Sequence, residues 1–163
     1  MQRANYYKVE PELMAYLINQ ESLIKQKVEA SFGLTIWELL KLRASQLNQC
    51  AYCLAMHSKQ ALEYGESINR IIALNAWQDT PLYNDKERAA LALCEKLTLS
   101  QHIDDDFYLT LAKLFDQQSL VTLTVAINAI NSWNRIVKMF KPTVEFNAIL
   151  QITPAKYKKL IQQ

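Results

Sequence analysis

Glycine and proline are scarce in this 163-residue chain. It holds two glycines and four prolines, whereas average usage is about 7% and 5%. The tight turns that join strands depend on these residues, so a fold built from hairpins is disfavoured. Half of the residues are hydrophobic, which is enough to bury one sizeable core. The sequence therefore predicts an all-α fold.

Apolar residues recur at helical spacing through most of the chain, and we expect about six to eight helices in one domain over residues 1–163. Helices are expected to begin at capping residues, namely Thr35, Asn48, Ser67 and Asp85. Glu38, three residues after Thr35, completes a capping-box pattern. Helices are expected to end near the two glycines, Gly33 and Gly65.

The longest unbroken helical pattern covers residues 116–140 and is apolar nearly all round. One apolar stripe comprises Leu120, Leu123, Ile127, Ile130 and Val137, and a second comprises Val121, Val125, Ala129 and Ile136. Such a helix is expected to lie inside the domain or between subunits. Asparagine recurs on it at positions 128, 131 and 134, and we expect some of these amides to be buried with hydrogen-bond partners. Residues 154–163 are expected to dock as a short helix or to fray.

The charge balance argues against a polyanionic partner. Eighteen basic and sixteen acidic residues give a net charge of +2, too little for a nucleic-acid surface or a polybasic membrane anchor. The first residues lack the apolar core of a secretion signal, and no apolar run reaches the length of a membrane span. We therefore expect a cytoplasmic protein. In that reducing compartment close cysteine pairs bind metal or act as redox couples rather than forming a structural disulfide framework.

Cys50, Cys53 and His57 form the main chemical constellation. On a helix the three residues fall within an arc of roughly 60°, and residues three apart have Cα atoms about 5 Å apart, within disulfide range. If Asn48 caps the helix, Cys50 lies in its first turn, where free N–H groups stabilise a thiolate. His57, one turn after Cys53, is placed to exchange a proton.

The residues alone leave several interpretations open. Redox chemistry is favoured, but the same three side chains are also ligand types for a metal, and two small buried thiols with a structural histidine are a further alternative. Structural zinc requires four ligands, and no second cysteine pair supplies the fourth. No strand pattern precedes the cysteines, which excludes the thioredoxin arrangement. Cys94, on an apolar helix face, is predicted to be a buried core thiol.

A family resemblance supports the redox interpretation. Glu38, Cys50, Cys53 and His57, at spacings of 12, 3 and 4 residues, resemble the signature of the alkyl hydroperoxidase AhpD-like proteins in the carboxymuconolactone decarboxylase superfamily. The segments LLKLRASQLNQCAYCLAMHSKQA, AWQDTPLYNDKERAALALCEKLT and AINAINSWNRI are also similar to that family. The resemblance covers roughly residues 34–136. It implies an orthogonal helical bundle that assembles into trimers or hexamers.

The resemblance also implies a peroxidase cycle without a bound cofactor or metal. Cys53 would attack the hydroperoxide, Cys50 would resolve the sulfenic acid as a disulfide, and His57 with Glu38 would relay protons. An external dithiol, a lipoyl protein or a thioredoxin-like donor, would reduce the disulfide. One departure is Tyr52, which stands where the family's peroxidases carry a histidine between the cysteines. The alternative is a non-enzymatic redox sensor or an oligomeric interaction module of the same fold.

Overall fold

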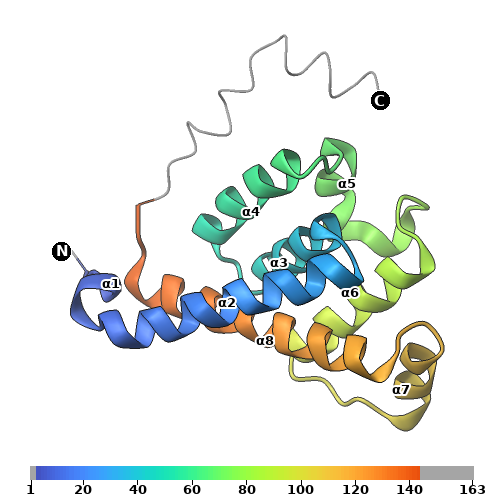
Figure 1. Ribbon diagram of the computed structural model, residues 1–163. Coiled ribbons are helices and arrows are strands. Elements are labelled where there is room, and N and C mark those ends of the chain that lie inside the picture. Colours follow the sequence, from blue (N-terminus) through green and yellow to red (C-terminus); the bar gives the residue numbers. More distant parts are fainter. Residues whose placement is uncertain (1–2, 144–163) are drawn as a thin grey trace.

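The protein is a bundle of helices in the computed structural model, which describes residues 3–143 (Figure 1). Within this range there are eight α-helices, one 3-10 helix (η1) and no strand, so the prediction of an all-α fold with six to eight helices is confirmed. The elements are α1 Tyr6–Val9, α2 Pro11–Ser31, α3 Leu34–Leu47, α4 Ala51–Glu63, α5 Ile68–Ala73, η1 Leu74–Asp79, α6 Asp85–Thr98, α7 Asp105–Ala112 and α8 Gln117–Phe140. The predicted C-terminal helix at residues 154–163 lies outside the described residues.

Two of the predicted helix ends require a positive φ, which glycine adopts easily. Gly33 and Gly65, with φ of 84° and 89°, follow α2 and α4. At the end of α4 the N–H of Gly65 donates to Leu62 and that of Glu66 to Ala61, which satisfies carbonyls that the helix leaves free. The prediction that helices end near both glycines is confirmed.

The predicted N-terminal caps are correct at one position and wrong at three. Ser67 caps α5 by accepting from the N–H of Asn69. Asp85 does not cap α6, because Asn84 does so in a capping box with Glu87. Thr35 lies inside α3, which begins one residue earlier after Gly33, and Asn48 caps the end of α3 rather than the start of α4.

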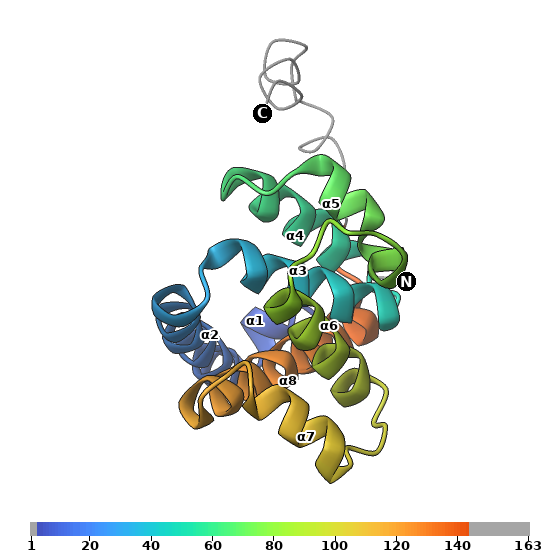
Figure 2. The ribbon, with the colours of Figure 1, turned by 90° about the vertical axis from the view of Figure 1, so that its right-hand side faces the viewer.

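Helix α3 is the centre of the bundle. It packs against α2, α4, α6 and α8, and the turned view in Figure 2 shows it between α4 and α8. Every residue from Ile36 to Ser45 is buried, including the charged side chains of Glu38, Lys41 and Arg43. A buried charge must be paired to be tolerated, so the position of α3 forces these side chains into ion pairs.

Helix α8 has one buried stripe and one that is partly exposed. All five residues of the first predicted stripe are buried, whereas Val121 and Val125 of the second stripe are 64% and 38% exposed. Asn131 and Asn134 are buried and Asn128 is exposed. Despite the length of α2 and α8, none of the helices in residues 3–143 is long and apolar enough to cross a membrane.

Candidate active site

Cys50 and Cys53 are joined by a disulfide at the start of α4. The sulfur atoms are 2.19 Å apart and the Cα atoms 5.3 Å apart. Cys50 is the N-cap residue of α4 and Cys53 lies in its first turn. The prediction that Asn48 caps this helix, with Cys50 inside the first turn, is therefore wrong by two residues. No side chain within residues 3–143 caps α4, so the N–H groups of its first turn have no capping partner there near Cys50.

Asn48 instead anchors the turn before the cysteines to α8. Its side-chain amide donates to Asn131 Oδ1 at 2.7 Å and to Asn134 Oδ1 at 2.9 Å. The amide of Asn134 donates to Ser45 Oγ at 3.1 Å, and that of Asn131 to Thr98 Oγ1 at 3.0 Å. The expectation that some asparagines of this helix are buried with partners is confirmed. This network links α3, α6 and α8.

The hydrogen-bond partners of His57 fix which of its two ring nitrogens carries the hydrogen in the neutral ring. His57 Nδ1 lies 2.9 Å from Glu38 Oε2 and 3.0 Å from Gln60 Oε1. Both partners present oxygen atoms that only accept hydrogen bonds, so Nδ1 carries the hydrogen and donates it. In the neutral ring the second nitrogen, Nε2, is then the atom that accepts a proton. The side chains of His57 and Glu38 are both buried, which holds the ring in this orientation.

Lys41 pairs with the buried carboxylate of Glu38. Lys41 Nζ lies 2.9 Å from Glu38 Oε1, 3.0 Å from Glu21 Oε1 and 4.3 Å from the centre of the Trp37 ring. Burial acts to raise the pKa of Glu38, but the hydrogen bond from His57 and the charge of Lys41 outweigh it. The pKa of Glu38 consequently lies below its usual value of 4.5. The ionised carboxylate of Glu38 thus accepts the hydrogen bond from His57 Nδ1.

Cys53 and His57 line the same cavity, which we call the Cys53 cavity. It has a volume of about 200 Å³, and the two residues are one turn apart on α4. Most of the remaining lining is aromatic or apolar, from α1, α4 and α8. It comprises Tyr6, Tyr7, Tyr52, Met56, Ile130, Trp133 and Val137, with the polar Glu21, Lys41 and Gln60. Cys50 does not line this cavity.

The four candidate residues from the sequence thus lie together, but in a different arrangement from the one expected. Cys53 and His57 line one cavity, His57 is hydrogen-bonded to Glu38, and Cys50 is linked to Cys53 by the disulfide. Sequence reasoning missed Lys41 and the two N-terminal tyrosines. Lys41 is three residues after Glu38, a spacing that pairs charges on a helix and is a usable signal. Nothing in the sequence brings Tyr6 and Tyr7 to α4.

The third cysteine is separate from this group. Cys94 is 0% exposed and its sulfur donates to the carbonyl oxygen of Leu40 at 3.5 Å. Burial raises the pKa of Cys94 to about 12, so it carries no thiolate at neutral pH. The prediction of a buried core thiol is confirmed. In the part of the chain that the structure describes, no group of three or more His, Cys, Asp or Glu side chains is arranged to hold a metal ion.

Comparison with known proteins gives the family. Residues 11–96 match the carboxymuconolactone decarboxylase family. The uncharacterized protein YdfG of Bacillus subtilis is 41% identical over 137 residues, which cover 83% of this chain and 91% of YdfG. The uncharacterized protein YnjA of Escherichia coli is 32% identical over 94 residues, 57% of this chain and 52% of YnjA.

Solved structures show the same fold. A protein of unknown function from Agrobacterium tumefaciens, proposed to be the antioxidant defence protein AhpD, superposes with a TM-score of 0.82 at 33% identity, covering 89% of this chain and 99% of that one. The debrominase Bmp8 in complex with 2,3,4-tribromopyrrole superposes with a TM-score of 0.75 at 18% identity, covering 93% and 78%, and shares the fold alone. The chain is therefore a member of the carboxymuconolactone decarboxylase family with an AhpD-like fold.

Proposed function

We propose that this protein is a thiol-dependent alkyl hydroperoxide reductase that serves antioxidant defence. The observation that carries the proposal is the shared cavity of Cys53 and His57, with Glu38 bound to the far side of the imidazole. A thiol that reacts with hydroperoxides needs a base to form its thiolate and a second thiol close enough to resolve the product. His57 and Cys50 meet these two needs.

The proposed cycle has three steps. The Cys53 thiolate attacks one oxygen of the hydroperoxide, the O–O bond breaks, and the products are the Cys53 sulfenic acid and an alcohol, whose proton comes from His57. The Cys50 thiol then attacks the sulfenic sulfur and releases water, forming the disulfide seen in the structure. An external dithiol reduces the disulfide by exchange and becomes a disulfide itself.

Glu38 and Lys41 act as positioning residues for His57. Because Nδ1 donates to Glu38, Nε2 is left to take the proton of Cys53 and to return it to the leaving oxygen. The ionised carboxylate stabilises the resulting imidazolium, and Lys41 keeps the carboxylate ionised. This arrangement supplies a proton path without a histidine between the cysteines, where the chain has Tyr52.

The lining of the Cys53 cavity supports an organic substrate. Tyr6, Tyr7 and Trp133 surround a small volume of about 200 Å³, and aromatic walls favour an apolar group next to the reacting oxygens. We therefore expect a higher specificity constant for organic hydroperoxides than for hydrogen peroxide. The reductant is a lipoyl protein or a thioredoxin-like donor, and the working form is a homo-oligomer.

The test is turnover of cumene hydroperoxide with dihydrolipoamide as the reductant. Wild-type protein is expected to consume both in a one-to-one ratio over many cycles, and Cys53→Ser is expected to lose turnover. Cys94→Ser is the matched control, because its thiol is buried and its one donated bond to Leu40 is available to a hydroxyl. Consumption of a single equivalent of hydroperoxide, with the disulfide formed but no turnover, would favour the redox-sensor alternative instead.

A further inference from the structure

We propose that the reductant is an anionic dithiol and that it enters by attacking Cys50 from a positively charged cavity on the side of the disulfide away from His57. This inference rests on the proposed function, because it names the reductant of the same disulfide. It depends on two observations and one chemical argument. Each cysteine lines a different cavity, and the cavity at Cys50 is lined by lysines. The two leaving thiolates are stabilised in different ways.

The two cysteines of the disulfide line different cavities. Cys53 lines the Cys53 cavity with His57, and Cys50 lines a second cavity of about 370 Å³, which we call the Cys50 cavity. Tyr52 and Val137 line both cavities. In thiol–disulfide exchange, access decides which sulfur is attacked. A hydroperoxide in one cavity and a dithiol in the other therefore reach different ends of the same bond.

The Cys50 cavity is positively charged. Lys138 and Lys141 line it, and among the described residues neither pairs with a carboxylate and no acidic side chain lines the cavity. The cavity adjoins a larger one of about 550 Å³, because Tyr52, Lys141 and Pro142 line both.

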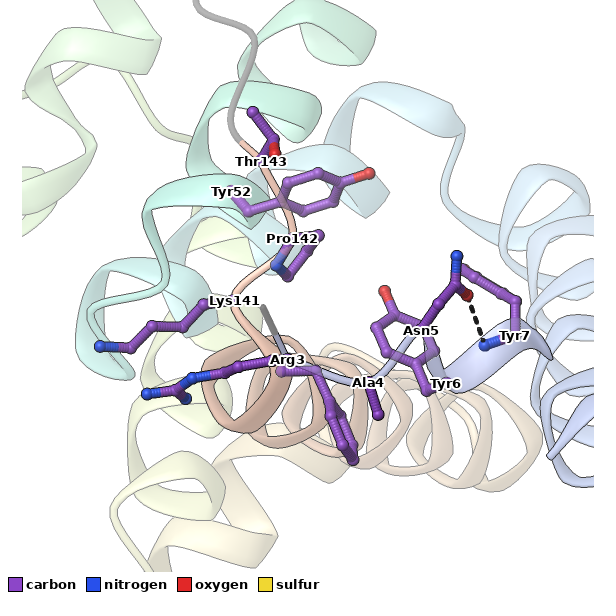
Figure 3. A pocket seen from close by; sticks show the side chains of 10 residues that line it. Arg3, Ala4, Asn5, Tyr6, Tyr7, Tyr52, Lys141, Pro142 and Thr143 are labelled. Atoms are coloured by element: carbon purple, nitrogen blue, oxygen red, sulfur yellow. Dashed lines mark hydrogen bonds between the residues drawn. The ribbon is translucent and has the colours of Figure 1, made fainter. Parts of the chain in front are cut away.

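The larger cavity adds a third cation. Figure 3 shows Arg3 and Lys141 extending in the same direction along its edge, and the Arg3 guanidinium donates to the carbonyl oxygen of Met139. No acidic side chain of the described residues lines this cavity either. The Cys53 cavity differs, because there Lys41 is neutralised by Glu21 and Glu38. Cations that pair with no carboxylate of residues 3–143 surround Cys50, and they attract a reductant whose dithiol lies next to a negative group.

The exchange chemistry agrees with entry at Cys50. A thiolate of the reductant attacks the Cys50 sulfur, the Cys50–Cys53 bond breaks, and Cys53 leaves as a thiolate in the cavity that holds His57. The second thiol of the reductant then attacks its own sulfur in the mixed disulfide and releases the Cys50 thiolate. That thiolate is formed at the uncapped N-terminus of α4. Two electrons pass from the dithiol to the protein, and the reductant leaves as its disulfide.

The experiment compares two dithiols that differ only in charge. Dihydrolipoate carries a carboxylate and dihydrolipoamide a neutral amide, so the ratio of their rate constants for reducing the oxidised protein reports the electrostatic contribution. We expect dihydrolipoate to be the faster reductant of wild-type protein, with a ratio that falls as salt is raised. The double variant Lys138→Gln/Lys141→Gln is expected to lower that ratio by about fivefold and to leave the dihydrolipoamide rate within about twofold.

A matched variant and a probe of each thiol complete the test. Lys86→Gln/Lys113→Gln removes the same charge from lysines that line none of the three cavities, and its ratio should equal that of wild type. The anionic disulfide 5,5′-dithiobis(2-nitrobenzoate) should react with Cys50 in Cys53→Ser, and Lys138→Gln/Lys141→Gln in that background should slow the reaction. The same lysine changes, made in Cys50→Ser, should not slow the reaction of Cys53 with 5,5′-dithiobis(2-nitrobenzoate).

An unchanged ratio in Lys138→Gln/Lys141→Gln, or equal slowing of both dithiols, would overturn the inference. All of these reactions start from the disulfide or from single thiols and contain no hydroperoxide. A normal charge effect without hydroperoxide turnover would therefore contradict the proposed function alone. Normal turnover without a charge effect would contradict this inference alone.

Discussion

Glu38 is the residue whose surroundings depart most from those expected of a carboxylate. It is 1% exposed, yet its pKa lies below the usual value because His57 and Lys41 outweigh the effect of burial. Removing one partner of a buried charge leaves the other uncompensated, and this costs more than an exposed ion pair contributes. Glu38 therefore links the protonation of the site to the stability of the fold.

Glu38→Gln should destabilise the protein in a pH-dependent way. Because the folded-state pKa lies below the unfolded value of 4.5, the ionised carboxylate stabilises the fold above that pH and loses this effect as the pH falls through the folded-state pKa. We expect a loss of about 2–4 kcal/mol in the free energy of unfolding at neutral pH, and a smaller loss at about pH 3.5. Urea unfolding followed by circular dichroism measures both values.

Glu29→Gln is the control for this prediction, because Glu29 is exposed on α2. It should change the free energy of unfolding by less than about 0.5 kcal/mol at either pH. The same loss for Glu38→Gln at both pH values would show that the carboxylate does not act through its charge.

At the residue scale, the sequence identifies the candidate site residues, but it predicts only some of the contacts between them. The spacing of Cys53 and His57 on one helix is sufficient to bring them to one cavity. The contact between Glu38 and His57 joins α3 to α4 across a turn, so helical periodicity does not predict it and only the family resemblance did. The capping-box interpretation of Glu38 is wrong because α3 begins at Leu34, before Thr35.

At the element scale, the turn between α3 and α4 is the segment that sets the position of the disulfide. Gln49 has a positive φ of 54°, which costs energy for a residue with a side chain. Asn48, just before it, is bound to Asn131 and Asn134 of α8. Tertiary hydrogen bonds thus hold a backbone conformation that the local sequence does not favour.

Asn134→Ala should therefore weaken the fold. Asn134 is 0% exposed, and it accepts from Asn48 and donates to Ser45. Truncation leaves these polar groups without their partner, which costs about 1–3 kcal/mol. Thermal and urea unfolding measure the loss. Asn128→Ala on the same helix is the matched control, because Asn128 is exposed, and a loss as large as that of Asn134→Ala would contradict the network's role.

The helix starts show why local signals are incomplete. Asn84 and Asp85 are adjacent and both are good capping residues; the register is decided by the capping box with Glu87. Asn48 has the right chemistry for an N-cap, but its side chain is used by α8. Because a residue distant in the sequence binds the Asn48 side chain, Asn48 does not cap α4, and α4 begins later than predicted.

At the scale of the whole molecule, the scarcity of glycine and proline predicts the all-α fold. It does not predict which helix faces contact other subunits. Val121 and Val125 lie one turn apart on α8 and are exposed, whereas the opposite stripe is buried. Exposed apolar side chains grouped on one face are typical of a protein–protein contact. This face is our candidate for subunit association, in keeping with the proposed homo-oligomer.

We expect a trimer or a hexamer when the protein is analysed by size-exclusion chromatography with light scattering. Val121→Glu/Val125→Glu should shift it toward smaller species, because charges in an apolar contact are unfavourable. Gln78→Glu/Gln101→Glu adds the same charge at exposed positions on η1 and after α6 and should leave the mass unchanged. A wild-type monomer at all concentrations would contradict the proposed assembly.

The bond between Cys50 and Cys53 spans only three positions of the chain. A crosslink that closes so short a ring removes little freedom from the unfolded polypeptide, whereas one that joins distant segments removes much more. Its loss consequently leaves the architecture almost untouched, since the helices are held by their core. We therefore expect reduction of this disulfide to leave the helical bundle folded, as the proposed redox cycle requires.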